Sequence, residues 1–189
     1  MAWMVHTARI KGSDWAVCIG GFREVKVVDV DSILDRFKAE VSGSVFQLFD
    51  ADRVAGWEHI YFASVNAVKA FETEAAVSKS LAIEVLLYAS CQDQITVAFS
   101  ILGISPNTER VALLVMCDGV SEAKHVFKKA SKLIGNEDDS VLLVDNEKFD
   151  ELKRVYSISD LELEAVAGSR EEALARLIIE RGALLPVRR

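Results

Sequence analysis

The segment from Arg110 to Cys117 (RVALLVMC) constrains the fold more than any other part of the chain. It is a short run of large apolar and β-branched residues, which is the pattern of a strand. Ser121 follows as a candidate N-cap, and apolar residues then recur at helical spacing as far as Gly135. We therefore predict a strand followed directly by an amphipathic helix.

Shorter patterns predict the other elements. Apolar stretches predict strands over residues 15–20, 45–49 and 141–145, and an edge strand in the final ALLPV segment, where Pro186 is tolerated. Apolar residues at helical spacing predict helices over residues 30–41, 57–71, 81–90, 92–102, 147–155 and 169–182. Strands and helices do not alternate regularly, which favours an α+β fold with a mixed sheet and helices packed against it.

Several small residues mark where these elements begin and end. Gly20 and Gly21 come at the end of a strand, which predicts a turn, and Gly182 is placed to close the last helix. Ser169 and Glu172 have the spacing of a capping box, which predicts that this helix begins there.

The segment from Leu81 to Ser90 (LAIEVLLYAS) is apolar nearly all round, with Glu84 as its only charge. This is typical of a helix enclosed by protein, so we expect it in the core, where the Glu84 carboxylate would need a partner. The next segment continues helically, with Ile95, Phe99 and Leu102 on one side.

Composition limits the class of protein. With 189 residues the chain can bury a core without crosslinks, and one domain over residues 1–189 is expected. A formal net charge of −7 argues against a protein that coats nucleic acid, so any nucleic-acid contact would be local. The first residues lack a signal-peptide layout and charges interrupt every apolar run, so we expect a cytoplasmic protein that does not enter a membrane.

The sequence has no spacing typical of a catalytic or metal site. His6, His59 and His125 form no metal-binding motif, the three cysteines form no C-x-x-C pair, and no glycine-rich phosphate loop is present. We therefore expect no metal and no cofactor.

An enzyme with a site assembled from scattered residues such as His59, Glu84 and Asp93 is the alternative. Glu84 in an open pocket beside His59 would favour the enzyme. Glu84 bonded to backbone or to lysine would favour a binding protein.

Three lysines, Lys124, Lys128 and Lys132, recur every four residues on the helix after the strongest strand, with Lys129 beside them. They form a basic stripe opposite the apolar one. A solvated helix face accounts for this stripe, and the more specific alternative is a surface that contacts phosphate.

An ordered set of motifs between Asn66 and Ile104 resembles the small kinase-binding subunits of the KEOPS complex, the family of the PRPK-binding protein. The set contains an A-x-x-A-F-like pattern at Ala67–Phe71, a turn at Val77–Leu81, the helix L-x-x-E-[IVL]-L-L-Y-A-[SAG] at Leu81–Ser90, and Gln94-Ile95 before a helix that ends in Gly-Ile. The later strand, its helix and the closing LIIERGALLPV are also similar, so the resemblance covers residues 15–187. One position differs from the family pattern, because this chain has Asp93 where the family has an arginine.

The resemblance implies a non-catalytic regulatory subunit of a hetero-oligomeric complex that forms threonylcarbamoyladenosine at position 37 of tRNA. Such a subunit would bind and modulate the kinase-like ATPase subunit and help hold the 3′ CCA end of the tRNA. The residues expected at the kinase are Leu174, Leu177 and Ile178, which could equally be core. Those expected at the RNA are Asn66, Lys69, Lys79 and Gln94, and Phe71 or Tyr88 could assist by stacking. A structural adaptor without an RNA role is a further alternative.

Overall fold

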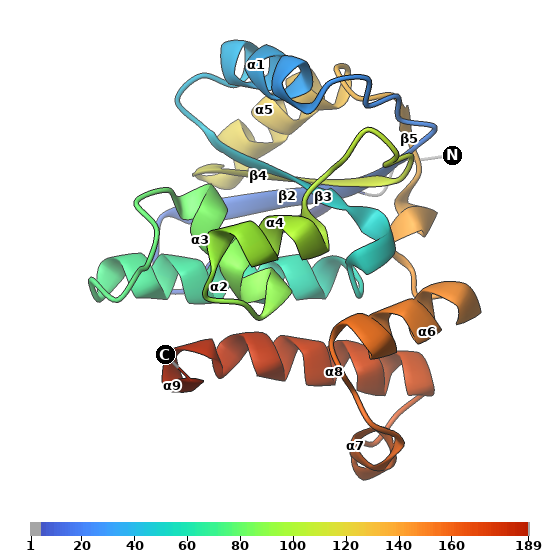
Figure 1. Cartoon of the computed structure of the whole chain (residues 1–189). Helices are drawn as coiled ribbons and strands as arrows, with labels where there is room; N and C mark the ends of the chain where they lie inside the picture. The colour runs from blue at the N-terminus through green and yellow to red at the C-terminus, as the bar shows by residue number, and fades with distance from the viewer. Residues whose placement is uncertain (1–4, 189) are drawn as a thin grey trace. The chain divides into compact units, whose positions relative to one another are not determined.

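A computed structural model describes residues 5–188 and confirms the α+β class (Figure 1). The chain forms two compact units, which we call the sheet unit and the helical unit. The sheet unit contains residues 5–52 and Gly103–Leu142, and the helical unit contains Arg53–Leu102 and residues 143–188. The expectation of one domain over the whole chain stays a prediction.

The sheet unit is built on a five-stranded sheet in the order β1-β2-β4-β3, with β5 also paired to β2. The strands are β1 (His6–Arg9), β2 (Trp15–Arg23), β3 (Val45–Asp50), β4 (Val111–Asp118) and β5 (Asn136–Glu137). Each strand pair in the described residues is antiparallel, so the expectation of a mixed sheet was wrong. Every residue of β4 from Val111 to Cys117 is buried, which confirms the strongest strand prediction.

Helices α1 (Val30–Glu40) and α5 (Val120–Ser131) belong to the same unit, and α5 lies against β2 and β4. Asp29 caps α1, because its carboxylate accepts the backbone N–H of Ser32 at 2.8 Å. The N-cap of α5 is Gly119 rather than Ser121. The apolar face of α5 packs with side chains of β2, β3 and β4 in one core cluster, as its spacing predicts.

Gly20 and Gly21 lie within β2 and do not form the predicted turn. A Cβ atom on Gly20 would lie 2.7 Å from the ring of Phe127, and one on Gly21 would lie 2.7 Å from the carbonyl oxygen of Asp138. These glycines therefore allow α5 and the chain after β5 to approach the strand closely.

The predicted strand over residues 141–145 was also wrong. A 3₁₀ helix, η2 (Asp139–Leu142), occupies this region and buries Val141 and Leu142. The Asp138 carboxylate accepts the N–H of Ser140 at 3.0 Å, and this local bond favours a turn over a strand.

The helical unit contains seven α-helices in the described residues (Figure 1). They are α2 (Trp57–Glu72), α3 (Leu81–Ser90), α4 (Ile95–Leu102), α6 (Asn146–Val155), α7 (Asp160–Ala165), α8 (Arg170–Ala183) and α9 (Leu185–Arg188), and the 3₁₀ helix η1 (Ala51–Arg53) precedes α2. The capping box of Ser169 and Glu172 is present, as predicted. Helix α7, which has its own capping box at Ser159 and Glu162, was not predicted.

Two boundaries in this unit differ from prediction. The helix expected from residue 92 begins only at Ile95, because Cys91 takes a left-handed conformation and the chain bends by 69° between α3 and α4. Gly182 does not close α8, and the ALLPV segment forms α9 instead of an edge strand. A Cβ atom on Gly182 would lie 2.6 Å from the carbonyl oxygen of Tyr88, so glycine is needed there for α8 to approach α3.

No single helix among residues 5–188 is long and apolar enough to cross a membrane. Helices α3 and α4 reach that length and composition only as a bent pair, and α3 is largely buried in protein.

Candidate partner-binding surface of the helical unit

His59 holds the first turn of α2 to the end of α3. Its Nδ1 accepts the N–H of Ala55 at 3.1 Å, so its Nε2 carries the proton and donates to the carbonyl oxygen of Ala89 at 2.8 Å. The side chain is 2% exposed, and this burial lowers the pKa of His59 to about 4. His59 is therefore a neutral residue with both ring nitrogens engaged in holding helices together.

Glu84 is buried in α3, as its setting in the sequence predicts. Its Oε2 accepts two backbone N–H groups from the loop before the helix, that of Val77 at 3.1 Å and that of Ser78 at 2.9 Å. These bonds fix the loop to the helix, and the 0% exposure of Glu84 keeps its carboxylate away from solvent. This is the outcome that favours a binding protein over an enzyme.

The other residues considered for chemistry have no common site. Asp93 is exposed, and no group of three or more His, Cys, Asp or Glu side chains in residues 5–188 could hold a metal ion. Cys18 and Cys117 are buried in strands, where burial raises the pKa of each thiol and disfavours a reactive thiolate. Burial also raises the pKa of Cys91, to about 12.

Leu174, Leu177 and Ile178 lie in the core of the helical unit. Their exposed fractions are 0%, 9% and 0%. They pack in one cluster with side chains from α6 and α7, among them Phe149 and Leu163. The free chain therefore does not present these side chains to a partner, and the kinase contact predicted at them remains without support from the structure.

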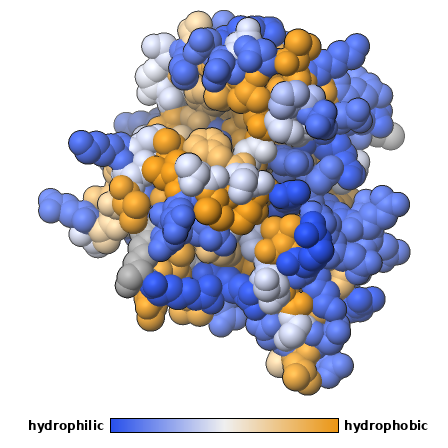
Figure 2. All heavy atoms as spheres, in the orientation of Figure 1, coloured by the Kyte–Doolittle hydropathy of each residue, from blue (hydrophilic) through white to orange (hydrophobic). Residues whose placement is uncertain are grey.

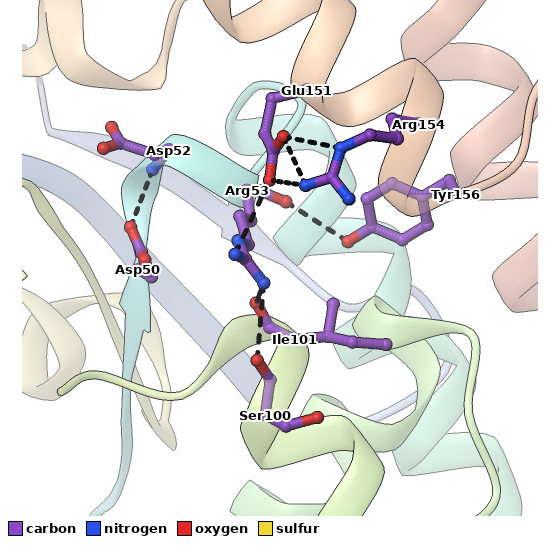
Figure 3. Close-up of polar contacts among 8 residues, drawn as sticks. All are labelled: Asp50, Asp52, Arg53, Ser100, Ile101, Glu151, Arg154 and Tyr156. Carbon is purple, nitrogen blue, oxygen red and sulfur yellow. Dashed lines mark hydrogen bonds and ion pairs between the residues drawn. The ribbon is translucent and has the colours of Figure 1, made fainter.

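Arg53 joins α4 to α6 through the contacts drawn in Figure 3. Its guanidinium donates to the carbonyl oxygens of Ser100 and Ile101 at 3.3 and 3.2 Å, and pairs with Glu151 at 3.5 Å. The Tyr156 hydroxyl lies 3.2 Å from the carbonyl oxygen of Arg53. The last turn of α4 is thus capped by a cation from outside the helix, which fixes the orientation of α4.

The residues predicted at RNA are divided between two ends of α3. The bond from His59 to Ala89 joins the start of α2 to the end of α3, so these helices are antiparallel. Lys69 and Lys79 are exposed near the end of α2 and the start of α3, and Asn66 is half-buried one turn earlier in α2. Gln94 is exposed beyond the other end of α3, a helix about 15 Å long. The structure therefore groups Asn66, Lys69 and Lys79 and separates Gln94 from them.

Helix α4 has no charged residue and exposes large apolar side chains, Ile95 at 38% and Phe99 at 41%. These residues are four apart and share a helix face, while Ala98 and Leu102 form the buried face. Figure 2 shows apolar side chains gathered over this helix. Ile95, Phe99 and Leu102 have the spacing of one helix side, yet only Leu102 is fully buried, so spacing alone does not identify which apolar residues of α4 face the core.

An α+β protein that uses its buried polar groups to fix helices, and exposes an uncharged helix, has the features of a partner-binding protein. A sequence model of the family described as kinase binding protein CGI-121 matches residues 22–185. Regulatory protein Cgi121 of Methanocaldococcus jannaschii is 32% identical over 117 residues, which are 61% of this chain and 72% of that protein. The chain belongs to the CGI-121 family of kinase-binding proteins.

Proposed function

We propose that this chain is the non-catalytic regulatory subunit of a cytoplasmic KEOPS-type complex and binds its kinase-like ATPase subunit. The family match over residues 22–185 is the observation that carries this proposal. The hydrogen bonds from backbone N–H groups to Glu84 support a binding role. Glu84 was the strongest candidate for an acid–base residue, and these bonds give it a structural role instead.

We place the kinase contact on α4. Ile95 and Phe99 form an apolar surface without a charge in the same helix, and burial of large side chains supplies most of the free energy at such contacts. The Arg53 cap fixes the end of this helix, so the surface is held in one orientation before binding.

Replacing both Ile95 and Phe99 with Asp is expected to weaken binding to the kinase-like subunit at least tenfold, because two charges would be buried against an apolar partner. The measurement is an affinity by biolayer interferometry, with the melting temperature of each variant as a check on folding. Phe62→Asp is the matched control, since Phe62 is 43% exposed on α2. Equal losses in both variants, or none in the α4 variant, would show that α4 is not the contact.

We further propose that the end of the α2–α3 pair helps to hold tRNA through its 3′ CCA end. Exposed Lys69 and Lys79 offer ammonium groups to phosphate, and Asn66 offers an amide. Glu72 and Glu74 are exposed in the same stretch of chain, so the contact would be local, in agreement with the net charge of −7.

Replacing Lys69 and Lys79 together with Glu is expected to reduce tRNA affinity severalfold at low salt, because repulsion replaces attraction to phosphate. Filter binding with intact tRNA and with tRNA lacking the CCA end measures the effect. A Lys26→Glu, Lys38→Glu variant carries the same charge change on the sheet unit and is the control. Unchanged affinity for the truncated tRNA would refute the contact with the CCA end.

A further inference from the structure

The sheet unit carries a groove between α5 and the edge strand β1, with a volume of about 710 Å³. Its apolar lining includes Val5 and Phe127, and Thr7 and Ser131 add hydroxyl groups. The basic stripe identified in the sequence, Lys124, Lys128 and Lys132, lines the same groove. These lysines therefore line one groove in addition to being exposed on a helix face.

Among residues 5–188, β1 pairs only with β2 and is the first strand in the sheet order, so one of its edges is open there. Ile10 donates its N–H to the carbonyl oxygen of Trp15 at 2.9 Å, and β1 and β2 are antiparallel from there to His6. Bonded and non-bonded pairs alternate in an antiparallel ladder, so Ala8 is in a bonded pair and Thr7 is not. The N–H and C=O of Thr7 therefore point away from β2, toward the open edge.

Helix α5 runs alongside β1 in the opposite direction. The N–H of Gly119, before α5, donates to the carbonyl oxygen of Asp14, before β2, at 3.1 Å. A Cβ atom on Gly135, after α5, would lie 3.6 Å from the carbonyl oxygen of Arg23, at the end of β2. Helix α5 therefore follows the direction of β2, to which β1 is antiparallel. Lysines four apart on a helix are separated by about 6 Å along its axis, and alternate residues of an extended chain by about 6.6 Å. An extended chain beside β1 would place every second side chain opposite a successive lysine.

We propose that this groove binds an extended acidic peptide segment of a partner protein, added as a further strand to β1. Backbone pairing at the open edge holds the segment, and alternate Asp or Glu side chains meet Lys124, Lys128 and Lys132. Glu137 is the only acid lining the groove among the described residues, so the lysines dominate its charge. This inference concerns the sheet unit and does not depend on the kinase or tRNA contacts proposed for the helical unit.

The probe is a fluorescein-labelled peptide of eight residues that alternates glutamate and valine, and the readout is fluorescence anisotropy with the full chain. A Lys124→Glu, Lys128→Glu, Lys132→Glu variant is expected to lose at least tenfold in affinity, because the lysines supply the attraction. The matched control is Lys11→Glu, Lys26→Glu, Lys129→Glu, which makes the same charge change at exposed lysines outside the groove and is expected to stay within twofold. Equal losses in the two variants would overturn the proposal.

A second pair of variants tests strand addition. Thr7→Pro removes the outward N–H without removing a backbone bond to β2, and is expected to lose at least tenfold in affinity for the acidic peptide. Thr7→Val loses the same hydroxyl contact with Cys18 of β2 (3.4 Å) but keeps the N–H, and is expected to retain binding. A lysine–valine peptide and a single-stranded oligouridine of eight nucleotides complete the assay. Saturable binding of the lysine–valine peptide or of the oligouridine, without binding of the acidic peptide, would overturn the proposal. Binding of the oligouridine alone would indicate that the groove is an RNA surface.

Discussion

Replacing Leu174 with Ala is expected to lower the free energy of unfolding by about 2–5 kcal/mol, the range for truncating a fully buried leucine. Leu174 is 0% exposed and packs in the core cluster of the helical unit. The loss has two sources, the smaller apolar area removed from water and the cavity left behind. Urea unfolding followed by circular dichroism measures it.

The same variant separates a core role from a partner contact. Leu174→Met keeps the volume of the side chain and is expected to cost less than about 1.5 kcal/mol. Well below its melting temperature, folded Leu174→Ala is expected to bind the kinase-like subunit with nearly normal affinity. Full stability combined with lost kinase binding would instead place Leu174 on the partner surface.

Stability is expected to fall by about 3 kcal/mol between pH 6.5 and pH 4 through His59 alone. The pKa of His59 is lowered to about 4 by burial, while the unfolded chain has the ordinary value near 6.5. As the pH falls through this window the unfolded state takes up a proton that the folded state does not, so folding loses free energy. Below pH 4 both states are protonated and the loss from His59 is complete.

His59→Gln is the control, because its amide can accept from Ala55 and donate to Ala89 but does not titrate. Urea unfolding at intervals from pH 7 to pH 4 should show the natural chain losing up to about 1.4 kcal/mol per pH unit more than the variant. Hydrogen bonds from Ser159, and a further bond from Arg181, lower the pKa of the Glu162 carboxyl from its ordinary value to about 2. The stability that this carboxyl contributes begins to fall near pH 4.5 in both proteins, so it cancels in the comparison. Parallel pH profiles for the two proteins would contradict the assignment of a buried neutral His59.

The apolar pattern of the sequence correctly predicted strand β4, helix α5 and the enclosed helix α3. Segments with so many apolar residues must be buried, and few other structures would bury them. The predictions were wrong where local hydrogen bonds, or the close approach of two backbone segments, determine the structure. Residues 141–145 have the pattern of a strand, yet the Asp138 carboxylate fixes a turn. Helix α7 could have been predicted, since Ser159 and Glu162 have the same capping-box spacing that identified α8.

The candidate surface was harder to predict than the fold. Apolar spacing indicates which residues share a helix face, but it does not distinguish a core from a contact surface. Leu174 and Ile178 therefore suggested a partner surface and lie in the core, whereas Ile95 and Phe99 are exposed. The family resemblance on residues 66–104 was more informative, because an ordered set of motifs is more specific than any one helix, and the family match confirms it.

Direct binding to the kinase-like ATPase subunit encoded in the same genome tests the central claim. Isothermal titration calorimetry of the two purified proteins is predicted to give a saturable one-to-one complex, and the ATPase rate of the kinase-like subunit should change until the same ratio is reached. Absence of heat and of co-elution at concentrations of about 100 μM, where a specific complex with a micromolar Kd would be nearly saturated, would contradict it.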